Sequence, residues 1–315
     1  MGAAAVARAL GALMIALAGF TAPAWILAWA IDDRAAFPRL GVVVAASLFL
    51  GLGLVAAVSG ARVRANAIAG LWTAVIGWSV LPFLAAPGFL GAPGVTGLGD
   101  AVFEATAALT TTGASVIPTD QSLSPALALW RACLCAFGGM AAVCGALILL
   151  SAVNLSGPGV HRTAFFTFDP DTFFNQAAKA TGAVAIVFAV ILSLTFLALW
   201  ASGNSALAAF ERACYALSTA GYAPSQSDDF ALNPLTTAAL TFALLAGASN
   251  FALHWDFLQG RPWGLYPADP ETRALVVIVA VFVGWLIWLG EPLAPALVEG
   301  AGLAATAVVD VSPRG

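Results

Sequence analysis

The sequence predicts an all-α integral membrane protein of about seven spans, in which helix–re-entrant loop–helix units repeat. Three observations predict this class. Of the 315 residues, 61% are hydrophobic and only 9% are charged, whereas soluble domains carry about 25% charged residues. The mean hydropathy is +0.94, and the apolar runs are long and continuous, unlike the alternating segments of membrane β-barrels. Two short apolar segments, each ending in hydroxyl residues and a glycine, lie between long runs.

The long apolar runs are interpreted as membrane spans, because a helix needs about 20 apolar residues to cross a bilayer. The sequence Thr21-Ala22-Pro23-Ala24 resembles a signal-peptidase site, but the apolar run continues beyond it, so we expect a retained span. The seven expected spans are residues 6–31, 40–59, 67–86, 126–153, 180–202, 235–254 and 274–290.

Basic residues orient the spans with the N-terminus in the cytoplasm, because Lys and Arg accumulate in cytoplasmic loops. Both short segments then open to the outside, and their loops carry acidic residues without Lys or Arg. Acidic mouths concentrate cations, although these residues are equally compatible with ordinary solvated loops. The acids are Asp100, Asp120, Asp228 and Asp229; the predicted inside residues are Arg8, Arg62, Arg64, Arg162, Lys179, Arg261 and Arg273, against Arg34 and Arg39 outside.

The first short segment, residues 99–110, ends in Thr110, Thr111, Thr112 and Gly113. It is too short to cross the bilayer as a helix, which favours a half-helix that enters the membrane and a non-helical strand that returns. Backbone at that depth must be buried in protein or line a water-filled cavity. Threonine hydroxyls and carbonyls beside a glycine can replace the water around a cation. An extracellular turn with a Thr-rich helix end is the alternative.

The second short segment, residues 205–217, repeats the first. Phe103 precedes Gly113 by ten residues, Phe210 precedes Gly221 by eleven, and a glutamate follows each phenylalanine. Two such units between long spans favour a pore. A half-helix entering from outside directs its partly negative C-terminal end to the membrane centre, which favours a cation there, and the glycine permits backbone angles that turn carbonyls inward.

These residues resemble the TrkH/KtrB potassium-uptake family, relatives of potassium channels, over essentially the whole chain. The matching signatures are both Thr/Ser-Gly segments, Trp130-Arg131, Gly138-Gly139-Met140, residues 250–254, and Asp269, Glu271 and Arg273. The resemblance implies a potassium-channel-like fold with a two-helix preamble, residues 1–60, and repeats at 61–154, 155–260 and 261–315, the third incomplete.

The resemblance also implies a function without covalent chemistry: potassium uptake across the bacterial inner membrane, with potassium as substrate and no bound cofactor. It implies a homodimer and a cytoplasmic nucleotide-binding regulatory subunit; no basic patch suggests nucleic acid. The expected filter residues are Thr110, Thr111, Thr112, Gly113, Ala114, Ser218, Thr219, Ala220, Gly221 and Tyr222, with potassium held by their backbone. The expected supporting residues are Glu104, Glu211, Arg131 and Asn250.

The roles of the supporting residues are predicted as follows. Glu104 and Glu211 brace their loops through hydrogen bonds rather than binding the ion, since a carboxylate in the membrane is usually partnered. Arg131 either pairs with a loop carboxylate or snorkels to the interface, and Asn250 either bonds across helices or packs. The four cysteines, Cys133, Cys135, Cys144 and Cys214, are interpreted as packing residues.

The chain departs from the family pattern in its third repeat. The expected filter at residues 304–308 has no glycine, and the sequence stops at Gly315. We expect a truncated or split member, a chain that assembles with another, or a non-conducting scaffold. An intramembrane hydrolase using Ser115 or Ser218 with His161 or His254 is disfavoured, because the predicted topology separates serines and histidines by a bilayer.

Overall fold

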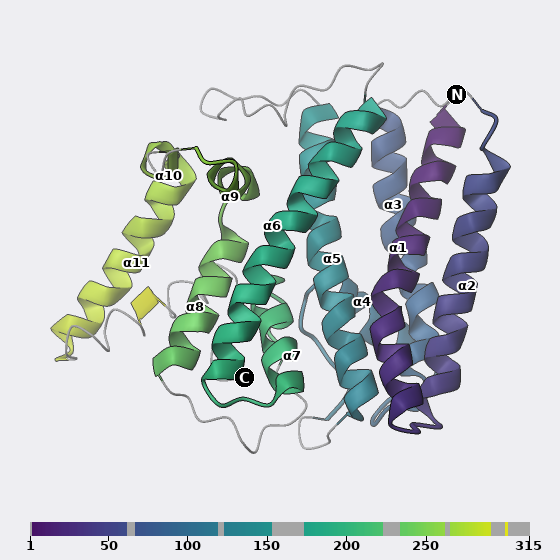
Figure 1. Cartoon of the computed structure of the whole chain (residues 1–315), viewed down its shortest axis with the longest axis horizontal. Helices are drawn as coiled ribbons and strands as arrows, with labels where there is room; N and C mark the ends of the chain where they lie inside the picture. The colour runs from purple at the N-terminus through teal and green to yellow at the C-terminus, as the bar shows by residue number, and fades with distance from the viewer. Residues whose placement is uncertain are drawn as a thin grey trace. The chain divides into compact units, whose positions relative to one another are not determined.

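A computed structural model describes residues 2–61, 67–118, 123–152, 173–222, 234–261, 265–290 and 300–301. These residues form helices and connecting turns without a strand, which confirms the predicted all-α class (Figure 1). The chain divides into two compact units, Met1–Thr181 and Gly182–Gly315.

The first unit is a bundle in which long helices enclose a short one (Figure 1). Helix α1 packs against α2, α3 and α5, and the short α4 contacts α3, η1 and α5. Helices α1 and α2 approach closely because glycines face each other: a Cβ on Gly11 would lie 2.7 Å from the Gly51 carbonyl oxygen. The elements are α1 (Gly2–Ala30), α2 (Ala36–Ala57), α3 (Ala67–Ala85), the 3-10 helix η1 (Ala86–Phe89), α4 (Leu98–Leu109) and α5 (Pro125–Ala152).

The second unit repeats the pattern of a short helix beside long ones. Buried residues of α6, α7 and α8 form one core cluster: Leu199, Ala209, Ala213 and Ala239. Ser205 caps the short helix by accepting the Ala208 amide at 3.3 Å. The elements are α6 (Phe173–Ala201), which begins within the first unit, α7 (Ala206–Leu217), α8 (Pro234–Ala248), α9 (Phe251–Leu258), α10 (Leu265–Ala268) and α11 (Pro270–Trp288).

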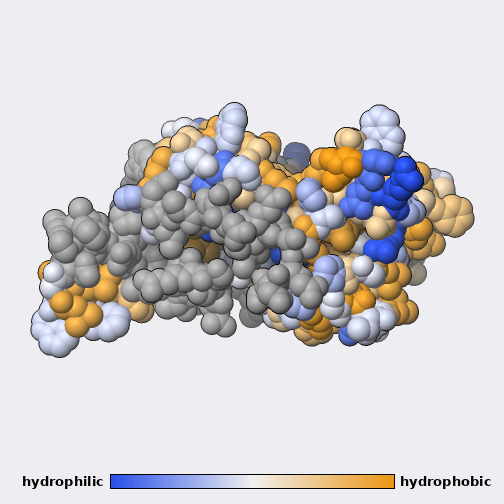
Figure 2. All heavy atoms as spheres, turned by 90° about the horizontal axis from the view of Figure 1, so that it is seen from below, coloured by the Kyte–Doolittle hydropathy of each residue, from blue (hydrophilic) through white to orange (hydrophobic). Residues whose placement is uncertain are grey.

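The lengths of the helices agree with a multi-pass membrane protein. Among the described residues, six helices are long and apolar enough to cross a membrane, and the bent pair α8 and α9 makes up to seven spans. Helices α4 and α7 have 12 residues each, too few to cross. Figure 2 shows hydrophobic residues along much of the rim of the molecule, with hydrophilic residues gathered in part of the end face.

The expected continuous span over residues 235–254 is wrong, because the helix breaks. α8 ends at Ala248, α9 begins at Phe251, and the two are bent by 105°. Asn250 has extended backbone angles and its Oδ1 accepts the Ala252 amide at 3.0 Å. An asparagine that caps a new helix competes with continuation of the old one, and overall apolarity does not reveal this competition.

Candidate ion-coordinating loops

The short helix α4, the first pore helix, ends in a turn that reverses the chain sharply. Thr111 follows the C-cap residue Thr110 and has φ +54°. Its amide donates to the Ala108 carbonyl at 3.2 Å, and the Thr112 amide donates to the Ala107 carbonyl at 2.9 Å. This bonding pattern is a Schellman motif, whose left-handed position usually holds glycine. A β-branched residue there is a strained exception.

Helix α7, the second pore helix, ends in the same motif. Thr219 follows the C-cap residue Ser218 and has φ +57°. Its amide donates to the Ala216 carbonyl at 3.1 Å, and the Ala220 amide donates to the Tyr215 carbonyl at 2.9 Å. The two motifs correspond bond for bond, so Thr111 and Thr219 occupy equivalent positions in the two repeats.

Each motif is followed by a glycine with positive φ. Gly113 has φ +74° and Gly221 has φ +70°, each two residues beyond the strained threonine. These are left-handed conformations that a Cβ disfavours. We name residues 110–114 the first filter loop and residues 218–222 the second filter loop; they share one backbone course although their sequences differ at most positions.

Four backbone carbonyls in each filter loop accept no hydrogen bond from the described residues. Within the described part of the chain, no hydrogen bond reaches the carbonyls of residues 110–113 or 218–221. Thr110 and Thr112 are exposed, so water can satisfy their carbonyls, whereas the other residues of the two stretches are buried or half-buried. Backbone carbonyls at such positions nearly always find a donor or water. Two short stretches of unpaired carbonyls at equivalent places therefore suit a ligand that accepts electron density from oxygen, such as a cation.

The side-chain oxygens of the two loops behave differently. Thr110 Oγ1 donates to the Thr106 carbonyl at 2.8 Å and lies 2.7 Å from Thr112 Oγ1. The equivalent Ser218 is buried, and its Oγ has no partner. Since the loops share a backbone course but differ in these side-chain bonds, the backbone is the part that each loop could present to an ion in the same way.

Glu104 links the first pore helix, by hydrogen bonds, to the non-helical segment that follows the first filter loop. Its Oε1 accepts the Ser115 hydroxyl at 2.7 Å, the Val116 amide at 2.6 Å and the Ile117 amide at 3.3 Å. The residue is fully buried, and its Oε2 has no hydrogen-bond partner. These bonds satisfy the backbone of a segment that has no secondary structure to do so.

The loop on the other side of this segment also holds it. A Cβ on Gly94, which has φ +75°, would lie 2.6 Å from the Val116 carbonyl oxygen and 2.8 Å from Pro118 Cδ. The non-helical segment after the first filter loop is thus packed between the Gly94 turn and Glu104.

Glu211 is also buried, but it lies one position earlier in its helix than Glu104 does. Counted back from the strained threonine, Glu104 is seven residues away and Glu211 is eight. The residue of α7 equivalent to Glu104 is therefore Arg212. Aligning the repeats on the Phe-Glu pair, as the sequence suggested, displaces the second helix by one residue.

The predicted acidic mouth is represented among the described residues by Asp100. It lies in the first turn of α4, outside the spans, and accepts the Thr96 hydroxyl at 2.6 Å and the Thr96 amide at 2.8 Å. These hydrogen bonds lower the pKa of the Asp100 carboxyl below its ordinary 3.8, so it is negative at neutral pH, where it also complements the helix N-terminus.

The chain aligns with several named potassium-uptake proteins. It is 30% identical to TrkH of Vibrio parahaemolyticus over 220 residues, 66% of this chain and 42% of that protein. It is 26% identical to TrkH of Escherichia coli K12 over 222 residues, 68% of this chain and 45% of that protein. It is also 26% identical to TrkI of Halomonas elongata over 221 residues, 69% of this chain and 43% of that protein. No protein-family model matches the chain.

The fold resembles the crystal structure of the potassium transporter TrkH from V. parahaemolyticus, with a TM-score of 0.76 and 22% identity, covering 97% of this chain and 64% of that one. The chain is therefore similar in sequence to TrkH and TrkI proteins and in fold to TrkH. The chain spans less than half the length of the curated relatives above. Transport of potassium by this chain is therefore proposed below.

The family's Trp-Arg pair lies inside the first unit. Trp130 is fully buried and Arg131 is 6% exposed, so the Arg131 guanidinium is held within the protein and does not reach the interface freely. Trp130 packs beside Phe89, with ring centroids 6.2 Å apart, and fills the space left by Gly88, whose Cβ would lie 2.5 Å from Trp130 Nε1.

The break between α8 and α9 is stabilised by His254. Its Nε2 lies 3.1 Å from the Ala246 carbonyl, which also accepts the Ser249 amide at 3.3 Å, and its Nδ1 lies 2.9 Å from the Tyr266 hydroxyl. Because a carbonyl only accepts, Nε2 carries the proton. Asn250 caps α9, whereas the sequence suggested a bond across helices or packing. The sequence did not indicate this cap or the contact of His254 with Ala246.

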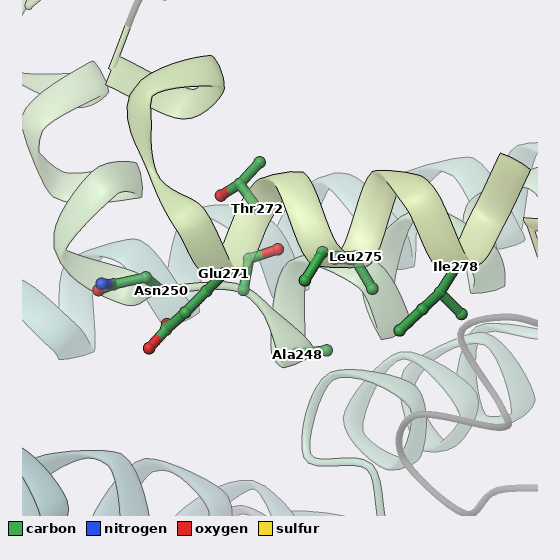
Figure 3. A pocket seen from close by; sticks show the side chains of 8 residues that line it. Ala248, Asn250, Glu271, Thr272, Leu275 and Ile278 are labelled. Atoms are coloured by element: carbon green, nitrogen blue, oxygen red, sulfur yellow. The ribbon is translucent and has the colours of Figure 1, made fainter. Parts of the chain in front are cut away.

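A cavity of about 260 Å³ lies against this break, between Ala248, Ser249 and Asn250 and the start of α11. Figure 3 shows Glu271, Leu275 and Ile278 along one face of α11, beside the break. Most of its wall is apolar. None of the residues that line the cavity belongs to a filter loop.

The hydrolase alternative finds no support among the described residues. Ser115 Oγ donates to Glu104, and the ring nitrogens of His254 bond to Ala246 and Tyr266. Neither described serine is hydrogen-bonded to a histidine. Other predicted features lie outside the described residues: Asp120, Asp228, Asp229, His161 and residues 304–308.

Proposed function

We propose that the chain takes part in potassium uptake across the cell membrane, with each of its two filter loops lending main-chain oxygens to dehydrated potassium. The observation that carries the proposal is the pair of equivalent loops in which the carbonyls of residues 110–113 and 218–221 have no donor among the described residues. Carbonyl rings are the known means of replacing an ion's hydration shell. Names of the relatives, which are potassium-uptake proteins, agree with this ion.

The physical arrangement favours a monovalent cation. Each filter loop follows the C-terminal, partly negative end of a pore helix, and the described loop residues contribute no formal charge of their own. Uncharged oxygens suit a singly charged ion, which must leave the site as readily as it enters. No covalent step belongs to this function, and no cofactor is required.

Further parts of the proposal follow from the resemblance to the TrkH/KtrB family. Two copies of the chain and a cytoplasmic nucleotide-binding subunit would form the working assembly in the inner membrane. The repeats would comprise residues 61–154, 155–260 and 261–315, after the preamble at 1–60. Glu104, Glu211, Arg131 and Asn250 would support the loops or the helices that hold them.

Uptake of radioactive rubidium, a potassium substitute, tests the function in cells lacking their own potassium uptake. Cells expressing the chain with its natural partners should accumulate rubidium above empty-vector cells, and excess potassium should abolish the signal more effectively than excess sodium. Failure to transport under every subunit combination, with the protein present in the membrane, would favour the alternative of a non-conducting scaffold. The glycine-free third filter segment motivates that alternative.

A further inference from the structure

In both repeats, the helix that follows the filter loop places a glycine against the end of the pore helix. On α5, a Cβ at Gly138 would overlap the Leu109 carbonyl oxygen and lie 2.7 Å from its carbonyl carbon and 2.9 Å from its Cα. On α8, a Cβ at Gly247 would lie 2.6 Å from the Leu217 carbonyl oxygen. Leu109 and Leu217 are the last residues of their pore helices.

The close neighbours of both glycines are backbone atoms. A side-chain neighbour could rotate away from an added methyl group, but a helix-terminal carbonyl cannot do so without moving the helix. Neither carbonyl takes part in the Schellman motif, which uses the two preceding carbonyls. Each instead faces a glycine Cα, an arrangement in which Cα–H···O contacts recur between closely packed helices.

Helical glycines differ in what an added Cβ would meet: Gly11 and Gly51 would each meet the other's carbonyl oxygen where α1 and α2 cross. Gly145 on α5 and Gly182 on α6 would have no atom within 4 Å of an added Cβ. Close backbone contact is therefore not a general property of glycines on α5 or α6, and what Gly138 and Gly247 share is contact with the last residue of a pore helix.

We propose that Gly138 and Gly247 are equivalent positioning residues, each setting how far its pore helix advances before the filter loop begins. Leu109 is bonded directly to Thr110, and Leu217 to Ser218, so a shift of the helix end moves the first loop carbonyl with it. The hydrogen bonds of the Schellman motif transmit the shift to the next residues. The inference rests on the proposed function, since it assigns the glycines to the ion-coordinating geometry.

The test compares Gly138→Ala and Gly247→Ala with the matched controls Gly145→Ala and Gly182→Ala, in the full natural polypeptide purified in detergent. Thermal unfolding is followed in choline chloride and with increasing KCl or NaCl, because an ion that binds the folded state raises the melting temperature. We expect all four variants to fold. The KCl concentration giving half the maximal shift should rise about tenfold or more for both test variants and stay unchanged for both controls.

The possible outcomes separate the two claims. If KCl and NaCl stabilise the wild-type protein equally, the proposed function is contradicted. If, in addition, Gly138→Ala and Gly145→Ala have equal melting temperatures in choline chloride, the claim that Gly138 contacts the end of the pore helix is overturned as well. If potassium stabilises the wild type selectively and both test variants respond as it does, only the positioning role is overturned. Loss of folding in both test variants with intact controls would reduce the glycines to structural residues and likewise overturn it. Gly247→Ala is the milder change, because its overlap is smaller.

Discussion

Thr111 and Thr219 adopt the same left-handed backbone conformation, with φ +54° and +57°, one residue beyond the C-caps of two pore helices. A β-branched residue is poorly suited to this conformation, and its occurrence at both equivalent positions points to a role that glycine would not fill. Strain of this kind is found where surrounding structure over-determines a functional geometry.

Replacing the strained threonine by glycine is expected to stabilise the fold and weaken ion binding. Thr219→Gly should raise the free energy of unfolding by about 0.5–1 kcal/mol, because glycine adopts positive φ without a steric penalty. It should also lower potassium-selective stabilisation, since the loop loses its rigid backbone. Urea or thermal unfolding with and without KCl measures both effects. Thr237→Gly in the helical part of α8 is the control and should destabilise; a destabilised Thr219→Gly would contradict the account.

Removing the Glu104 carboxylate is expected to release the non-helical segment behind the first filter loop. Glu104→Ala leaves the Val116 and Ile117 amides and the Ser115 hydroxyl without their acceptor, at a cost of about 2–4 kcal/mol in unfolding free energy. Glu104→Gln retains an acceptor oxygen and should cost less. Thermal unfolding and rubidium uptake are the measurements, with the exposed Glu271→Ala as control. Equal stability of Glu104→Ala and Glu271→Ala would refute the bracing role.

A side chain at the first filter glycine is expected to disturb selectivity. Gly113 has φ +74°, so Gly113→Ser must either strain the loop or turn its carbonyls from their present directions. The preference for potassium over sodium should fall. Competition of each ion with rubidium uptake measures it, and Gly99→Ser, at a glycine with nothing within 4 Å of a Cβ, is the control. Unchanged selectivity in a conducting preparation would disprove the role of Gly113.

The cap at the break between α8 and α9 is expected to contribute stability. Asn250→Ala removes the oxygen that accepts the Ala252 amide and should lower the free energy of unfolding by about 1 kcal/mol. Asn250→Asp keeps an acceptor at a helix N-terminus and should preserve most of it. Melting temperatures in detergent compare the pair. An alanine variant as stable as the aspartate variant would show that the break does not depend on the cap.

The pKa of Asp100 is expected to follow its bonds to Thr96. Thr96→Val removes the hydroxyl donor, the largest cause of the lowered pKa, so the carboxyl pKa should rise toward 3.8; Thr96→Ser should leave it low. Folding lowers this pKa, so its stabilising contribution is present at neutral pH and disappears as pH falls below about 4. Carboxyl-carbon NMR titration provides the measurement. An identical pKa in the valine and serine variants would contradict the assignment.

The spans and the two short segments could be predicted because they depend on length and apolarity, which the sequence states directly. An interval of ten residues from Phe103 to Gly113, and a similar one of eleven from Phe210 to Gly221, located both filter loops. Their role as ion ligands remains a prediction. Aligning the Phe-Glu pairs misplaced Glu211 by one position, because hydrogen bonds at the helix end, which a sequence does not display, define the structural register.

Other features could not be read from the sequence. The break at Asn250 depends on a capping oxygen that competes with an apolar helix, and an apolar average conceals that competition. Gly247 is one glycine among many in membrane helices, where small residues commonly serve packing. Only the three-dimensional structure shows that it faces the Leu217 carbonyl. The contact of His254 with Tyr266 joins residues on different helices, and no spacing rule predicts such a pair.

Anomalous diffraction from crystals of the full natural polypeptide grown in rubidium tests the central claim most directly. The account predicts anomalous density within bonding distance of carbonyl oxygens of residues 110–113 and likewise of residues 218–221, weakened when potassium replaces rubidium and retained when sodium is added. Rubidium bound only elsewhere, with neither filter loop in contact with an ion, would contradict it.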